Sequence, residues 1–345
     1  MSKTTYKSSG VDIDAGNHFI KLIKPHVDST QNKYSNTGLG GFSGAYSLPG
    51  NYKNPLLISA TDGVGTKLKL AIDSDVLHTV GIDLVAMSVN DLITCGAKPL
   101  FFLDYLATSK LIPEKHMDVI KGIVKGCREA GCVLIGGETA EMPGFYRKND
   151  FDLAGFAVGI VEKTKFINGK KVKSGDALIG LASSGLHSNG YSLARNVLLN
   201  KAKLKLDSKP KGFRRPLFRE LLEPTKIYVN SVMELIPKFD IKAIAHITGG
   251  GLLENIPRVL PKGCKVIIDS KSWKRPRIMD LIQEIGNIDE EEMQRTFNCG
   301  IGLVIITPDN QKNKIIKRLH TLGQKAFLIG EVTKSKKLLN QVNII

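Results

Sequence analysis

The chain has 345 residues, 42% of them hydrophobic and 24% charged, which is typical of a globular protein with a sizeable core and predicts two domains. No stretch is long and apolar enough to span a bilayer, and the first nine residues lack the apolar segment of an export signal, so we expect neither a membrane span nor secretion. The net charge of +16 lies almost wholly in residues 169–345, which contain 31 Lys and Arg and 16 Asp and Glu. The basic runs lack the interleaved aromatic residues that stack on bases, so a solvated basic surface is favoured over nucleic-acid binding.

Helices and strands are predicted to alternate along the chain. The expected helices are 81–94 and 113–131, and the expected strands are 56–60, 100–106, 132–135, 151–161, 177–182, 265–268 and 302–306. Residues 163–176 are polar and carry Asn-Gly and Ser-Gly turn signals, and the charge balance changes at the same place. We therefore predict an α/β or α+β protein with domains at 1–168 and 169–345.

The stretch Thr61-Asp-Gly-Val-Gly-Thr-Lys67 places two glycines, an acid, a hydroxyl and a lysine where the first strand is expected to turn. It is not the common phosphate loop, whose glycines stand four residues apart before Lys and Ser or Thr. The glycine-rich segment 38–44 also lacks the third glycine of the dinucleotide-binding fingerprint. If the protein binds a nucleotide, it therefore does so through neither of these two motifs.

The predicted helix 81–94 carries a polar strip on an otherwise apolar surface. Asp83 and Asn90 lie about 20° apart around the helix axis, and Asp91 is the next position. Such groups are costly to bury without partners. For Asp83 we favour a hydrogen-bonded network in the core. For Asn90 and Asp91, together with Asp62 of the glycine turn, we favour a shared Mg²⁺, which prefers oxygen ligands.

Three other segments combine glycines with polar residues, namely 136–144, 185–190 and 246–251. Backbone N–H groups freed by glycine can hold phosphate oxygens, but such loops can equally be ordinary turns. The first contains Glu138 and Glu141 directly after a predicted buried strand. The two readings stay open from the residues alone.

The five cysteines form no Cys-x-x-Cys pair, and the first of them is Cys95. An odd, scattered set favours reduced thiols in the cytoplasm over a disulfide framework, and it disfavours a zinc site.

Taken in order, these segments resemble the phosphoribosylformylglycinamidine cyclo-ligase family, also called aminoimidazole ribonucleotide synthetases. The similar blocks cover essentially the whole chain: 10–17, 38–42, 61–67, 81–92, 136–144, 188–192, 223–228, 246–257 and 295–300. Two departures are Leu186, where a proline is expected, and the basic pair Lys274-Arg275 beside Trp273. Neither touches the acidic segments.

The resemblance implies an ATP-dependent ligase of purine biosynthesis that closes the ring of aminoimidazole ribonucleotide from formylglycinamidine ribonucleotide and releases ADP and phosphate. The formyl oxygen would attack the γ-phosphate and leave as phosphate on ring closure. The implied fold is a two-domain homodimer whose first domains form a β-barrel and whose second domain is α/β. It is a cytoplasmic enzyme without nucleic-acid or membrane partners.

Other enzymes of the same superfamily are alternatives, among them a small-molecule kinase and selenophosphate synthetase. The latter usually needs a cysteine or selenocysteine near its N-terminus, where this chain has none before Cys95. A basic RNA-binding protein is a more remote alternative.

The resemblance also implies roles for individual residues. The implied Mg²⁺ ligands are Asp62, Asp91, Asn90 and Glu138. The implied contacts to ATP phosphates are Asp62, Gly63, Gly65, Thr66, Lys67 and Lys24. The implied substrate contacts are His187, Ser188, Asn189, Gly249, Gly250 and Gly251, and the implied catalytic residues are His187, Asp91 and Lys24. Whether a monovalent cation is also needed stays open.

Overall fold

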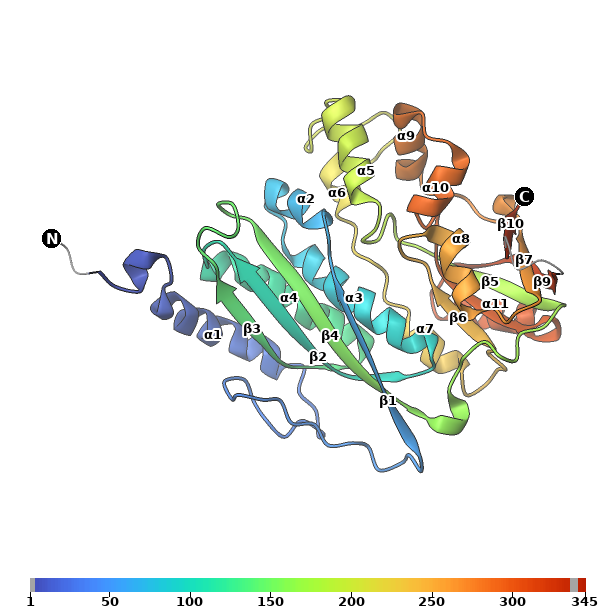
Figure 1. The fold of residues 1–345 in the computed structure, drawn as a ribbon, viewed down its shortest axis with the longest axis horizontal. Coiled ribbons are helices and arrows are strands. Elements are labelled where there is room, and N and C mark those ends of the chain that lie inside the picture. Colours follow the sequence, from blue (N-terminus) through green and yellow to red (C-terminus); the bar gives the residue numbers. More distant parts are fainter. Residues whose placement is uncertain (1–3, 336–340) are drawn as a thin grey trace.

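Two sheets organise the protein, as Figure 1 shows for a computed structural model that describes residues 4–335 and 341–345. The first sheet has four strands in the order β1-β4-β2-β3, and the second has six in the order β10-β7-β9-β5-β8-β6. The strands of the first sheet are β1 Pro55–Gly63, β2 Lys98–Thr108, β3 Val133–Glu141 and β4 Phe151–Glu162. Those of the second are β5 Asp176–Ala182, β6 Ala243–His246, β7 Cys264–Ile268, β8 Ile301–Pro308, β9 Ala326–Lys334 and β10 Val342–Ile344.

Helices cover one face of the first sheet, behind it in Figure 1. They are α1 Ile13–Asp28, α3 His78–Thr94 and α4 Pro113–Ala130, while α2 Lys67–Ser74 follows the end of β1 and contacts α3. Helix α3 is buried on almost every side, as expected for a helix that is apolar around its whole circumference. It approaches α4 so closely that a Cβ on Gly122 would lie 1.9 Å from the His78 carbonyl oxygen. Glycine is therefore required at this crossing.

The opposite face of the first sheet presents large apolar side chains to solvent. Leu57, Tyr105 and Phe156 are 57%, 40% and 42% exposed. Side chains alternate between the two faces along each strand. Phe156 pairs with Thr61, and Thr61 is four residues from Leu57 on β1, so Phe156 and Leu57 point to the same face. Several large apolar side chains exposed on one face of a sheet are typical of a contact surface.

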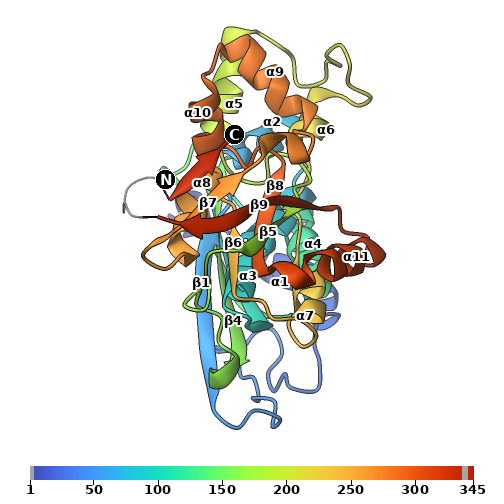
Figure 2. The same ribbon diagram turned by 90° about the vertical axis from the view of Figure 1, so that its right-hand side faces the viewer.

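The second half contains shorter helices around its sheet, which Figure 2 turns toward the viewer. They are α5 Tyr191–Arg195, α6 Leu217–Leu221, α7 Val229–Leu235, α8 Gly251–Asn255, α9 Arg277–Gly286, α10 Glu290–Thr296 and α11 Lys312–Thr321. The largest hydrophobic core contains residues of both halves, from Phe19 to Ala326. The segment 163–175 joins the last strand of the first sheet to the first strand of the second.

The predicted helices and strands are all present, with changed ends. Helix α3 begins at His78, three residues before the predicted start, and α4 ends where Gly131 adopts a left-handed φ of 68°. Strand β3 continues through the Gly-Gly pair to Glu141, so the first acidic segment is largely strand, where we expected a loop. No helix among the described residues is long and apolar enough to cross a membrane.

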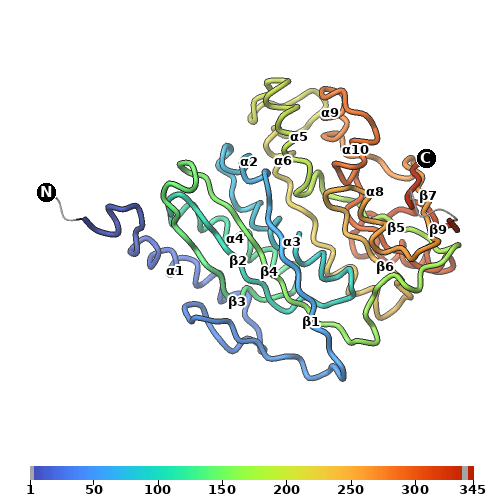
Figure 3. Tube along the Cα trace, viewed as in Figure 1, coloured from blue at the N-terminus to red at the C-terminus, as the bar shows by residue number. Residues whose placement is uncertain are grey.

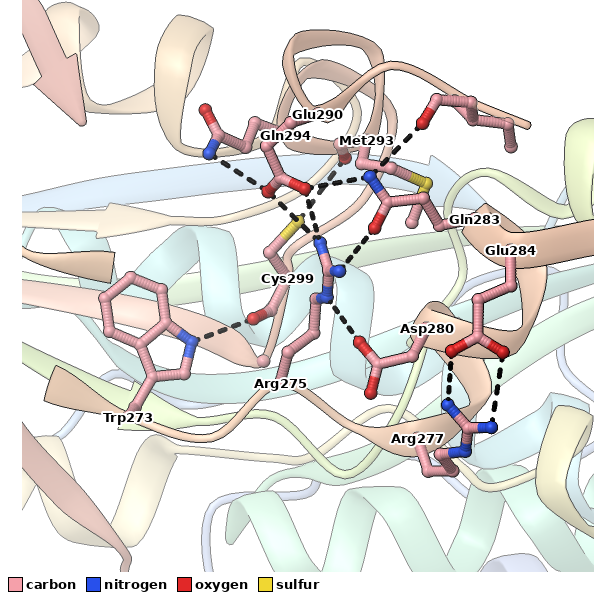
Figure 4. Close-up of polar contacts among 12 residues, drawn as sticks. Trp273, Arg275, Arg277, Asp280, Gln283, Glu284, Glu290, Met293, Gln294 and Cys299 are labelled. Carbon is pink, nitrogen blue, oxygen red and sulfur yellow. Dashed lines mark hydrogen bonds and ion pairs between the residues drawn. The ribbon is translucent and has the colours of Figure 1, made fainter. Parts of the chain in front are cut away.

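Arg275, one of the two basic departures from the family pattern, ties α9 to α10 (Figure 4). Its guanidinium donates to Asp280 Oδ1 at 2.8 Å, to both Glu290 carboxylate oxygens at 3.0 and 3.1 Å, and to Gln283. Charge-assisted bonds that share one planar group hold geometry well. The residue is therefore a structural cross-link of the second half.

We expect Arg275→Ala to lower the free energy of unfolding by about 2 kcal/mol, since it removes several charge-assisted bonds at once. The measurement is urea denaturation followed by circular dichroism. The matched control is Arg277→Ala, which removes a nearby arginine, the first residue of α9, whose ion-pair partner among the described residues is the exposed Glu284, and which should change stability little. Equal effects of the two variants would contradict the cross-link.

Candidate active site

Asp62 near the end of β1 and Asp91 on α3 lie close enough for their charges to interact. Asp62 is half-buried and its Oδ1 accepts the Gly63 N–H at 2.7 Å. Burial raises the pKa of the Asp62 carboxyl above its ordinary value, the Gly63 N–H lowers it, and the negative charge of Asp91 raises it further. The two carboxyl groups thus lie close enough to repel one another. A divalent cation would relieve that repulsion.

His246 is a residue of this site to which the sequence assigned no role. It ends β6 of the second sheet, is buried, and its Nδ1 lies 2.8 Å from Oδ1 of Asp91. Its Nε2 is buried and without a hydrogen-bond partner among the described residues. The available signal was its position directly before the Ile-Thr-Gly-Gly-Gly run, in which we considered the glycines, as a phosphate-binding loop or an ordinary turn, and gave the histidine no role. The Asp91–His246 contact joins the two halves of the chain.

The loop between β5 and α5 carries other buried polar atoms that have no hydrogen-bond partner in the described part of the chain. They are Ser183 Oγ, His187 Nδ1 and Asn189 Oδ1. A Cβ on Gly249 would lie 3.7 Å from Asn189 Nδ2, so this loop meets the glycine run that follows β6. Buried polar groups in native proteins nearly always have a partner, so unsatisfied atoms at one junction point to a bound ligand or ordered water.

His187 itself is buried and adopts a left-handed backbone with φ of 63°. Its Nε2 accepts the Ser184 N–H at 3.2 Å, so the proton of the neutral ring resides on Nδ1. Burial lowers the pKa of His187 well below its ordinary value, and the charges of His246 and Lys67 lower it further. The imidazole is therefore neutral at physiological pH.

The predicted role of Lys67 as a phosphate ligand does not fit the structure. Its side chain is wholly buried, and its ammonium group lies 2.7 Å from Asp83 Oδ2 and donates to the carbonyl oxygens of His187 at 2.9 Å and Glu223 at 2.8 Å. An ammonium group has three donors, and all are occupied. Gly65 and Thr66, directly before Lys67, are by contrast exposed.

The contacts of Asn90 do not favour its predicted role as a metal ligand. Its side-chain oxygen accepts the Tyr228 N–H at 3.0 Å, and its nitrogen donates to the Lys226 carbonyl at 2.8 Å. Together with Asp83, which accepts both donors of Thr225, it anchors the extended segment 223–228 along α3 (Figure 3). The core network that we favoured for Asp83 is confirmed, and Asn90 belongs to it.

A second polar group lies at the far edge of the first sheet. A cavity of about 280 Å³ is lined by the glycine-rich segment 38–44, Leu103, Asp104 and 135–138. The ammonium of Lys24 on α1 lies 4.0 Å from where a Cβ on Gly38 would stand. Burial raises the pKa of Asp104 to about 7. Thus Lys24 and Glu138 belong to one neighbourhood, and Asp62 and Asp91 to another.

The strand register shows why these neighbourhoods are separate. Asp62 pairs with Gly155, Gly155 with Asp104, and Asp104 with Gly137, so Asp62 and the residue before Glu138 are three strand spacings apart, roughly 14 Å. Among the described residues no three His, Cys, Asp or Glu side chains come together as a metal site. Glu138 therefore does not join Asp62 and Asp91 within one chain.

Comparisons with known proteins agree on one family. Residues 48–161 match the family described as AIR synthase related protein, N-terminal domain, and residues 173–341 match its C-terminal domain. The chain is 58% identical to the phosphoribosylformylglycinamidine cyclo-ligase of Citrifermentans bemidjiense over 96% of both chains. It is 53% identical to the enzyme of the same name from Myxococcus xanthus over 95% of this chain and 96% of that one.

Solved structures share the fold at low sequence identity. Thiamine-monophosphate kinase from Stenotrophomonas maltophilia superposes with a TM-score of 0.69 at 16% identity, covering 94% of this chain and 95% of that one. The hydrogenase maturation protein HypE in complex with ATP gives a TM-score of 0.67 at 17% identity, covering 94% and 90%. With the profile matches and the close relatives, the mixed α/β architecture establishes that the chain belongs to the phosphoribosylformylglycinamidine cyclo-ligase family.

Proposed function

We propose that the protein uses ATP to close the imidazole ring of aminoimidazole ribonucleotide from formylglycinamidine ribonucleotide, with release of ADP and phosphate. The observation that carries this proposal is the junction at which Asp62 and Asp91 of the first half meet His246 and the unpartnered polar atoms of the second. Relatives that are 53–58% identical over nearly their whole length bear the name of this activity.

The residues of the first half fit the phosphoryl-transfer step. Expelling an amide oxygen is difficult, and its phosphorylation needs mainly positioning and charge neutralisation. Asp62 and Asp91 would hold Mg²⁺, which usually takes one or two carboxylates together with phosphate oxygens and which would neutralise the transferring group. The exposed backbone of Gly65 and the Thr66 hydroxyl would donate to the phosphates, while the Gly63 N–H is already bonded to Asp62.

The residues of the second half fit a substrate that carries hydrogen-bonding groups. Asn255 Nδ2 donates to the carbonyl oxygens of Gly249 at 3.1 Å and Gly251 at 2.8 Å, which fixes the glycine run. We assign the ribose phosphate to this run, Gly250 included. The protonated Nδ1 of His187 and the side chain of Asn189 would meet the substrate, with Ser188 supporting the same loop through Thr225.

Two copies of the chain would complete the site. The exposed apolar face of the first sheet fits the inside of a β-barrel built from two such sheets, in which the β1 and β3 edges no longer stay unpaired. In that homodimer, Glu138 and Lys24 of one subunit would approach Asp62 and Asp91 of the partner subunit. The cytoplasm, where free thiols stay reduced, suits its five unpaired cysteines.

The test of the activity is incubation of the purified protein with formylglycinamidine ribonucleotide and Mg-ATP, with a diazotisable-amine assay for the imidazole product. We expect product, ADP and phosphate in equal amounts. No product with this substrate, together with ADP formation on thiamine monophosphate, would instead identify a kinase of the same fold.

The shared site predicts complementation between inactive subunits. Asp91→Asn and Glu138→Gln should each abolish activity, and dimers reassembled from an equal mixture should regain about a quarter of wild-type turnover, because half are mixed and one of their two sites is intact. The measurement is turnover after joint refolding. A mixture of Asp62→Asn with Asp91→Asn should regain none, since both changes strike the same half-site. An inactive first mixture would contradict the shared site.

A further inference from the structure

Lys67 connects the two halves of the site through a buried ammonium group. The residue follows the exposed Gly65 and Thr66 directly and begins α2, but its side chain is directed inward and is 0% exposed. Its partners come from three separate segments, which are Asp83 of α3, the carbonyl of His187 and the carbonyl of Glu223. One ammonium group therefore holds the nucleotide-side turn and the substrate-side loop at a fixed separation.

Stability alone is a poor reason for this arrangement. Removing an ammonium and a carboxylate from water costs several kcal/mol for each ion, and apolar replacements of buried ion pairs are often neutral or stabilising. An apolar side chain in place of Lys67 could not make the two hydrogen bonds to the carbonyls. These two bonds are therefore what the buried ammonium group contributes.

The backbone that Lys67 holds is one that needs support. His187 is a non-glycine residue in the left-handed region, with φ of 63°, and such a conformation persists only where the surroundings impose it. The Lys67 ammonium binds the carbonyl of this very residue at 2.9 Å, and the Ser184 N–H holds its ring at 3.2 Å. Together these bonds set where the free Nδ1 of His187 points.

We propose that Lys67 is a positioning residue, whose bonds to the His187 and Glu223 carbonyls align the substrate loop with the nucleotide turn. The inference rests on the proposed function for its catalytic consequence. Its structural part, the hold of Lys67 on the His187 loop, stands independently and can be tested without substrate.

The decisive variant is Lys67→Met combined with Asp83→Asn. It leaves no unpaired buried charge, and an asparagine oxygen can still accept both donors of Thr225, so the bonds lost are those of the Lys67–Asp83 pair itself and the two to the carbonyls of His187 and Glu223. The matched control is Lys242→Met with Asp176→Asn, which neutralises another buried Lys–Asp pair, at 2.6 Å, within the second half.

Two measurements are made on both double variants. The first is modification of histidines by diethyl pyrocarbonate, mapped by mass spectrometry with the exposed His18 as internal standard. His187 should be protected in the wild type and in the control, and should react at least about tenfold faster in the Lys67 variant. The second is steady-state kinetics, in which kcat should fall about 100-fold while nucleotide binding changes less than about threefold.

Each outcome decides the question. Protection of His187 with kcat near wild type would overturn the proposal, and so would a Lys67 variant that does not fold while the control does, since that would make the pair purely structural. Absence of ring-closing activity in the wild type would refute the proposed function, and the modification experiment would still judge the hold on His187.

Discussion

Asp91→Asn is expected to lower ATP-dependent turnover at least about 1000-fold while the protein stays folded. The change removes one of the two carboxylates proposed to hold Mg²⁺, and loss of a group that stabilises developing charge costs 10²–10³ in rate for a single donor. Folding should survive because the Asp91 side chain is 47% exposed and an asparagine oxygen can still accept from His246 Nδ1. The measurements are turnover and the Mg²⁺ concentration dependence.

Asn90→Ala is the matched control from the neighbouring position. It should lower the free energy of unfolding by about 2 kcal/mol, because the Tyr228 N–H and the Lys226 carbonyl lose their buried partner. Its remaining turnover should show the Mg²⁺ dependence of the wild type. Wild-type turnover in Asp91→Asn, or an altered Mg²⁺ dependence in Asn90→Ala, would reverse the roles assigned to these two residues.

The sequence predicted most of the fold because the relevant patterns are local. The helix 113–131 is marked by proline at its start, glycine at its end and an apolar face, and the structure has it within one residue. The short helices of the second half and the edge strand β10 lack such signals, since their positions depend on the sheet against which they lie. The end of β3 was misjudged because a Gly-Gly pair usually marks a turn.

The candidate site was harder to predict because residue type does not reveal burial. Lys67 and Asn90 belong to segments whose composition fits a nucleotide site. In the structure, however, the side chains of both residues donate hydrogen bonds to backbone carbonyls more than 100 positions away. A single sequence cannot show those partners. His246 was missed for the same reason, since its significance appears only when β6 brings it to Asp91.

A pH-dependent gain in stability is expected for Asp104→Asn. Burial raises the pKa of Asp104 to about 7 in the folded protein, whereas an aspartate in the unfolded chain has its ordinary pKa of 3.8. The folded state therefore binds the proton more tightly, and the stability contributed by the neutral form is lost as the pH rises through 7. An asparagine carries no charge to desolvate, so the variant escapes this loss.

The difference in free energy of unfolding should be near zero at pH 4, should grow through pH 7, and should reach about 2 kcal/mol in favour of the variant at pH 8. Urea denaturation at each pH measures it. The matched control, Asp152→Asn on the exposed side of the neighbouring strand β4, should show no such trend. A destabilised Asp104→Asn at pH 8 would mean that the charged carboxylate has a partner in the assembled protein, as a cation or a basic group from a second subunit at this cavity would provide. The sign of the change in stability at pH 8 therefore shows whether Asp104 is an isolated buried acid or part of a site that is shared between subunits.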